Sequence, residues 1–122
     1  MNEKSLLKAF EPFCYWQAYD ATYRAKYRRD DGQAGLFVLL LNGELVYSGK
    51  FMNGLKSRVR VLRKKKDSDK GPYRQINREI KLALASGQVT EMLVLPLLHA
   101  TPAELTSRLK EVRKAVPPIW KS

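Results

Sequence analysis

Arg58 is the side chain in this sequence that is best placed to bind a phosphate group. It lies in residues 53–66, where Leu55, Val59 and Leu62 recur at helical spacing and predict a buried stripe. At about 100° per residue, Arg58 falls at the boundary between that stripe and the polar face. A guanidinium at the edge of an apolar core needs an anionic or carbonyl partner. The position therefore predicts either a phosphate-binding arginine or an ordinary structural ion pair.

Basic side chains are concentrated around Arg58. Residues 56–81 hold eleven Lys or Arg against three acids, an excess of eight out of a formal net charge of +11. Neutralising several phosphates at once releases condensed counterions, which gives strong, salt-sensitive and sequence-tolerant binding. The residues that we assign from this pattern to a nucleic-acid-binding surface are Lys50, Lys56, Arg58, Arg60, Arg63, Lys64, Lys65, Arg74, Arg78 and Lys81.

Composition limits the classes of protein to consider. The chain has 122 residues, of which 44% are hydrophobic, enough for one domain with a modest core. The net charge of +11 implies a polyanionic partner, with nucleic acid preferred over an anionic membrane surface. One cysteine, Cys14, and one histidine, His99, exclude an internal disulfide and a His-rich zinc site. No signal peptide and no long apolar run are visible, so we expect a cytoplasmic protein without a membrane partner.

The segment 35–50, GLFVLLLNGELVYSGK, predicts a β-hairpin. Asn42-Gly43 readily supplies the two positive φ values of a tight turn. The first strand is apolar on both faces, which is typical of a central strand covered by helices on both sides. The cross-strand pairs expected from this turn are Leu41 with Glu44, Leu39 with Val46, Val38 with Tyr47 and Phe37 with Ser48.

Residues 1–33 predict an N-terminal helical arm. Tyr15, Tyr19, Tyr23 and Tyr27 recur every four residues, a spacing that lines one side of a helix. The rings either dock the arm on the sheet or, with the basic residues between them, stack on exposed bases.

Three more elements follow the basic region. A helix is expected over about 72–86 and a strand over about 88–97. Thr101 and Glu104 form a capping-box pattern that predicts the start of a last helix. After it, Trp120 is expected to fold back onto the core. Together these elements predict an α+β domain over residues 34–122, with a three-stranded antiparallel sheet flanked by helices.

The order of these motifs resembles the GIY-YIG nuclease superfamily, in which Gly-Ile-Tyr begins the first hairpin strand and Tyr-Ile-Gly ends the second. Here Gly35-Leu36-Phe37 and Tyr47-Ser48-Gly49 stand at those places, and Arg58 matches the family's arginine on the next helix. The hairpin and the ending Pro117-Pro118-Ile119-Trp120 are most similar to phage endonuclease II-like members. The resemblance covers roughly residues 34–121. It implies a GIY-YIG-like fold and a site in which Tyr47, Arg58 and a glutamate with one divalent cation, Mg²⁺, cleave a phosphodiester.

The sequence departs from that family pattern at three positions. Phe37 replaces the first tyrosine, and alignment through Trp120 puts Arg108 at the metal-binding glutamate and Lys121 at the terminal asparagine. Glu111, three residues after Arg108, is a candidate displaced carboxylate. An arginine in place of a carboxylate turns a cation site into an anion site, so Arg108 joins the residues assigned to nucleic-acid binding.

Three functions follow from these observations. The favoured one is a nucleic-acid-binding protein of a phage or mobile element, a pseudoenzyme that binds duplex DNA through its basic face without cutting it and without a cofactor. The alternative is an active Mg²⁺-dependent endonuclease that uses Tyr47, Arg58 and Glu111. A second alternative is a basic inhibitor or interaction protein that targets an acidic protein.

Overall fold

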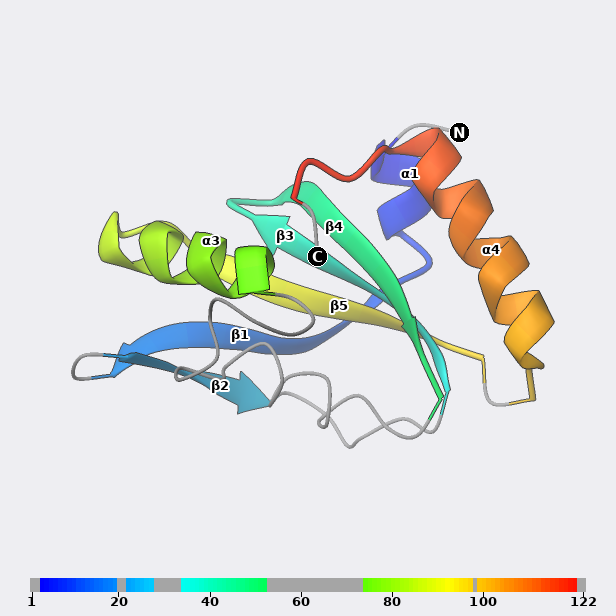
Figure 1. Ribbon diagram of the computed structural model, residues 1–122, viewed down its shortest axis with the longest axis horizontal. Coiled ribbons are helices and arrows are strands. Elements are labelled where there is room, and N and C mark those ends of the chain that lie inside the picture. Colours follow the sequence, from blue (N-terminus) through cyan, green and yellow to red (C-terminus); the bar gives the residue numbers. More distant parts are fainter. Residues whose placement is uncertain (1–2, 20–21, 28–33, 53–73, 98, 121–122) are drawn as a thin grey trace.

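The structure is a computed structural model that describes residues 3–19, 22–27, 34–52, 74–97 and 99–120. None of the helices in these ranges has the length and apolar character needed to cross a membrane. The elements, drawn in Figure 1, are α1 (Glu3–Leu7), β1 (Glu11–Tyr19), β2 (Thr22–Tyr27), β3 (Gly35–Leu41), β4 (Glu44–Phe51), α3 (Arg74–Ala85), β5 (Thr90–Pro96) and α4 (Pro102–Ala115).

The strands form one five-stranded sheet in the order β2-β1-β5-β3-β4. Every neighbouring pair is antiparallel. The α+β class and the antiparallel sheet are therefore confirmed, and β3, β4 and β5 are the three strands that the sequence predicted. The predicted number of strands is wrong, because two more strands come from the N-terminal part of the chain.

The predicted N-terminal helical arm is wrong. The only described helix there is α1, Glu3–Leu7, while Glu11–Tyr19 and Thr22–Tyr27 are strands. A spacing of four residues keeps side chains on one side of a helix, but it also keeps them on one side of a strand, whose period is two. The spacing of the tyrosines was therefore compatible with both structures. The segment is a strand because β1 pairs with β5, and that pairing joins residues far apart in the sequence.

The hairpin turn is as predicted, but the register changes within the hairpin. Asn42 and Gly43 have φ values of 51° and 84°, and Leu41 pairs with Glu44. Val46 is then an extra residue in β4, a β-bulge. The other three predicted pairs are wrong by one residue as a result: the observed pairs are Leu39 with Tyr47, Val38 with Ser48 and Phe37 with Gly49.

The bulge brings the ring of Phe37 over Gly49. A Cβ atom at Gly49 would lie 2.5 Å from Cζ of Phe37. Phe37 itself is fully buried. Only a glycine fits opposite the ring in this register, which gives the glycine of the Tyr-Ser-Gly sequence a packing role.

Helices cover both faces of β3, as its apolar sequence predicted. On one face, Phe37, Leu39 and Tyr47 form a core with Ile76 and Ile80 of α3. On the other, β3 packs against Leu6 of α1, against Phe10 after that helix, and against Leu105, Leu109 and Val112 of α4. Figure 1 shows α1 and α4 close together and α3 away from them. We call these the α3 face and the α4 face.

Helix α4 begins with the predicted capping box. The backbone N–H of Glu104 donates to Oγ1 of Thr101 at 3.2 Å, and the backbone N–H of Thr101 donates to the carboxylate of Glu104 at 3.4 Å. The two bonds satisfy donors that a helix start leaves open. The cap thereby fixes where α4 begins, and burial of Leu105, Leu109 and Val112 fixes which side of the helix faces the sheet.

Candidate functional site

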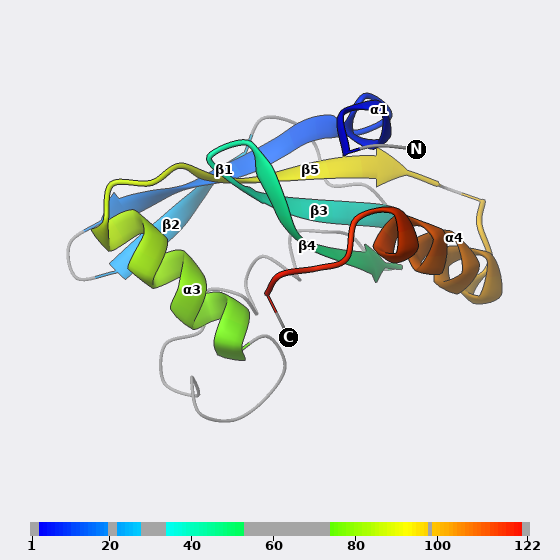
Figure 2. The ribbon, with the colours of Figure 1, turned by 90° about the horizontal axis from the view of Figure 1, so that it is seen from above.

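The C-terminal part of the chain covers the free edge of β4. The carbonyl of the bulged residue Val46 accepts hydrogen bonds from the backbone N–H groups of Ile119 and Trp120, at 2.9 and 2.8 Å. The carbonyl of Ser48 accepts one from Nη2 of Arg113 at 2.7 Å. These bonds occupy edge groups to which another strand could pair. Figure 2 shows the segment after α4 passing β4 on its way towards α3. Trp120 is buried in the core of the α3 face, as predicted.

Arg113 reaches Tyr47 around this edge. Its Nη2 lies 3.4 Å from the Tyr47 hydroxyl, and its Cζ lies 5.5 Å from the centroid of the tyrosine ring. The second distance is typical of a cation–π contact. Tyr47 is only 6% exposed, and its ring centroid is 6.1 Å from that of Phe37. Tyr47 is thus held between Phe37 on β3 and a guanidinium from α4.

The sequence analysis missed Arg113, although a signal for it was present. Arg113 follows the buried Leu109 by four residues, so it lies about 40° from Leu109 around the helix and at the edge of the buried stripe. The same reasoning had singled out Arg58. Arg113 also lies in the last turn of α4, where the helix dipole favours a positive charge.

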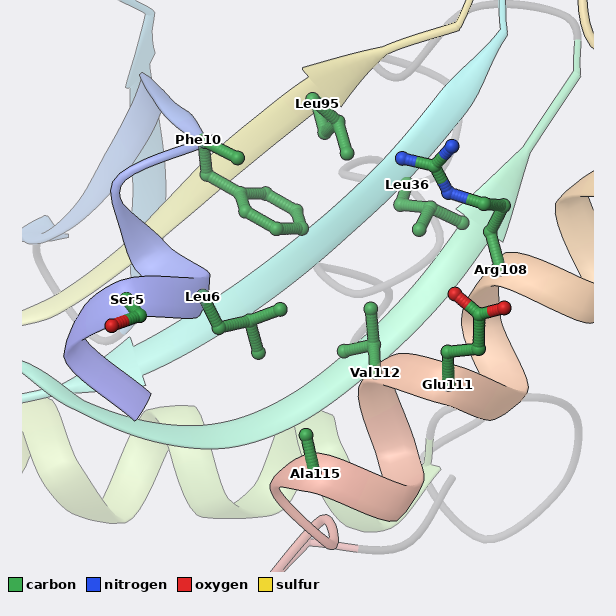
Figure 3. Close-up of a pocket in the computed structure, with 10 residues that line it drawn as sticks. Ser5, Leu6, Phe10, Leu36, Leu95, Arg108, Glu111, Val112 and Ala115 are labelled. Atoms are coloured by element: carbon green, nitrogen blue, oxygen red, sulfur yellow. The ribbon is translucent and has the colours of Figure 1, made fainter. Parts of the chain in front are cut away.

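Arg108 and Glu111 lie on another side of α4. Both line a pocket of about 230 Å³ between α1 and α4, together with Leu6, Phe10 and Leu36 among others. Figure 3 shows them projecting from α4 at the rim of this pocket. Arg113 follows Glu111 by two residues, which is about 200° around a helix. The position on α4 beside Tyr47 therefore belongs to Arg113, and the structure does not bring Arg108 or Glu111 there.

Most residues assigned to the basic surface lie outside the described residues: Lys56, Arg58, Arg60, Arg63, Lys64 and Lys65. Lys121, which was aligned with the family's terminal asparagine, also lies outside them. Arg78 and Lys81 lie on α3, which begins at Arg74. Lys50 lies on β4 and donates to Oγ1 of Thr106 on α4 at 2.5 Å. The described members are thus divided between the two faces of the sheet. One continuous positive surface stays a prediction.

The described groups around Tyr47 do not fit a divalent cation. Mg²⁺ binds oxygen ligands in octahedral geometry. The oxygens that the described contacts place here are the Tyr47 hydroxyl and the Ser48 carbonyl, and Arg113 donates to both. Its positive charge repels a metal ion. Over the described ranges of the chain, no three His, Cys, Asp or Glu side chains come together as a possible metal site.

Comparisons with known proteins identify the fold. No family model and no curated protein sequence matches the chain. A mutant of bacteriophage T4 EndoII superposes with a TM-score of 0.77 and 17% identity, covering 100% of both chains. The restriction endonuclease HPY188I, solved in complex with product DNA, superposes with a TM-score of 0.61 and 10% identity, over 95% of this chain and 82% of that one. At these identities the likeness extends to the fold alone, and the fold of this chain is nuclease-like.

Proposed function

We propose that this protein is a nucleic-acid-binding protein built on a degenerate GIY-YIG-like nuclease domain, and that it binds duplex DNA without cutting it. The observation that carries this proposal is the contact of Arg113 with Tyr47. The arginine puts a fixed positive charge at a place where a metal-dependent nuclease needs a carboxylate and a metal ion.

The charge of the chain supports a nucleic-acid partner. Its net charge is +11, and more than two thirds of that excess comes from residues 56–81. One of its structural neighbours was solved with product DNA. A basic protein with such a fold is suited to bind DNA mainly through its phosphates, since these contacts supply most of sequence-independent affinity.

The endonuclease alternative needs a carboxylate within metal reach of Tyr47. Glu111, the candidate displaced carboxylate, lines the pocket on the α1 side of α4. A rotation of about half a turn of α4 would be needed to bring Glu111 to the place of Arg113. That rotation would remove Leu109 and Val112 from the core of the α4 face, so the described packing opposes it.

Binding and cleavage can be measured together on supercoiled plasmid with Mg²⁺. We expect an electrophoretic shift whose affinity falls about tenfold or more between low and moderate salt, because several phosphates are contacted. We expect no nicking above a protein-free control. Nicking by the wild-type protein that is lost in Glu111→Gln would establish the endonuclease instead. Binding to an acidic protein, without any DNA shift, would favour the inhibitor alternative.

A further inference from the structure

We infer that Arg113 forms, beside Tyr47, a binding site for one phosphate group of a bound nucleic acid, and that this contact needs no metal ion. The inference rests on the proposed function, because it names the group of the DNA that this part of the protein holds. In place of a cation that must be recruited from solution, the helix α4 supplies a covalently attached one.

The guanidinium has donors to spare. An arginine carries five N–H donors. Within the described part of the chain, the hydrogen bonds of Arg113 come from Nη2 alone, to the Ser48 carbonyl and the Tyr47 hydroxyl. Among the described side chains, Nε of Arg113 is one of the few buried polar atoms without a hydrogen-bond partner. Nη1 makes no hydrogen bond within the described residues either, but it is not one of these buried atoms. Nη1 therefore has two N–H groups that a phosphate oxygen can accept.

The positive charge of Arg113 is also uncompensated. Among the described residues, no carboxylate makes an ion pair with it, and its contacts are with a carbonyl, a hydroxyl and an aromatic ring. A partly buried guanidinium gains most from an anionic partner, and its planar donor array matches phosphate well. A positive charge that is partly buried and has no carboxylate partner indicates that an anion binds beside Tyr47.

The site is held in place before any ligand arrives. Arg113 is anchored by a 2.7 Å bond to the edge of β4 and lies over the ring of Tyr47. A free arginine side chain loses considerable rotamer freedom when it binds a phosphate, whereas an anchored one has already lost it. Arg113 is thus expected to contribute more to affinity than an exposed cation of the same helix.

The experiment compares Arg113→Gln with Lys114→Gln, a matched control. Lys114 is the next residue of α4, it is exposed, and its replacement removes the same charge. Affinity for a DNA duplex is measured in EDTA and in Mg²⁺ at fixed ionic strength. We expect wild-type binding to be the same in both buffers, Arg113→Gln to bind at least about tenfold more weakly, and Lys114→Gln to bind within about threefold of wild type.

A second measurement uses the wild-type protein alone, because Arg113→Gln also loses the bond to Ser48 and could be less stable. The NMR resonance of the Arg113 Nε–H group, identified by its absence in Arg113→Gln, is followed during titration with inorganic phosphate. We expect it to shift with phosphate and to stay unchanged with sodium chloride of equal ionic strength.

The outcomes separate the inference from the proposed function. Equal losses in the two variants, no phosphate-dependent shift, or binding that requires Mg²⁺ would each overturn the phosphate site while leaving DNA binding intact. Absence of DNA binding by the wild-type protein, or Mg²⁺-dependent nicking, would overturn the proposed function itself.

Discussion

Arg113 combines a structural and a chemical task in one side chain. Its bond to Ser48 closes one end of the β4 edge, and its position over Tyr47 places a charge against the α3 face although α4 packs on the opposite face. A carboxylate in the same place would meet the Ser48 carbonyl, an acceptor that offers it no hydrogen bond. Where a carbonyl and a hydroxyl both point at one position, an arginine is the side chain that satisfies them together.

Gly49 offers a test of the register at the level of single atoms. Gly49→Ala would place a methyl group 2.5 Å from Cζ of Phe37, a ring that is fully buried, so the ring or the backbone must shift. We expect the free energy of unfolding to fall by about 1–3 kcal/mol, measured by urea denaturation.

The control for this prediction is a double-mutant cycle. Phe37→Leu shortens the side chain opposite Gly49, so Gly49→Ala should cost less in that background than in the wild type. Equal costs in the two backgrounds would show that the methyl group clashes with something other than the Phe37 ring, and the bulged register would then be in doubt.

At the scale of elements, the turn, the helix cap and the three strands β3, β4 and β5 were predictable, whereas the pairing of β1 with β5 and the bulge in the hairpin were not. Asn42-Gly43 and the Thr101 to Glu104 capping box act over two to four residues, and both are where the sequence placed them. The bulge at Val46 depends on a carbonyl that bonds to Ile119 and Trp120, more than 70 residues later. No pattern within the hairpin itself could reveal it.

The candidate site shows the same division. Tyr47 was found from the hairpin motif, since the motif lies within one element. Alignment through Trp120 drew attention to Arg108 on α4 and not to Arg113, because a count back from Trp120 carries no information on which side of the helix faces β4. The position of Arg113 relative to the buried Leu109 carried that information. Arg58 lies outside the described residues, so its place at the edge of a buried helical stripe stays a prediction.

The C-terminal segment is expected to be an integral part of the fold. Trp120 is 6% exposed, while its neighbour Ile119 is 60% exposed, although both donate backbone bonds to Val46. Trp120→Ala should therefore cost about 3–5 kcal/mol of stability. Ile119→Ala is the matched control and should change it by about 0.5 kcal/mol or less. Thermal unfolding of the two variants measures both. Similar, small effects would mean that the ring of Trp120 adds nothing to the core of the α3 face.

At the scale of the whole molecule, the nuclease-like fold does not depend on the large positive charge of the chain. The sheet and its two cores require no net charge, and a chain with +11 carries a self-repulsion that opposes its compact state. Under the proposed function, this excess of positive charge serves to attract a polyanion. The fold determines where these charges lie, and it distributes the described cations over α3, α4 and β4, on both sides of the sheet.

Charge reversal on opposite sides can decide which face meets the nucleic acid. Arg78 on α3 is exposed and belongs to the predicted basic surface, whereas Lys8, after α1 at the α4 face, is exposed and does not. Arg78→Glu and Lys8→Glu change the net charge equally, so any long-range field effect is the same for both. We expect Arg78→Glu to weaken duplex binding by about tenfold and to lower the slope of log K against log salt by about one, for every sequence tested.

Lys8→Glu should lower affinity by no more than about threefold. It should leave the slope of log K against log salt unchanged, because only cations that displace counterions from phosphates contribute to that slope. Titrations between 50 and 200 mM salt give both quantities. If the two variants weaken binding equally, the protein binds DNA through its general field and the α3 face has no special part in it. If Lys8→Glu has the larger effect, the interface lies on the α4 face, and the basic region 56–81 serves another purpose.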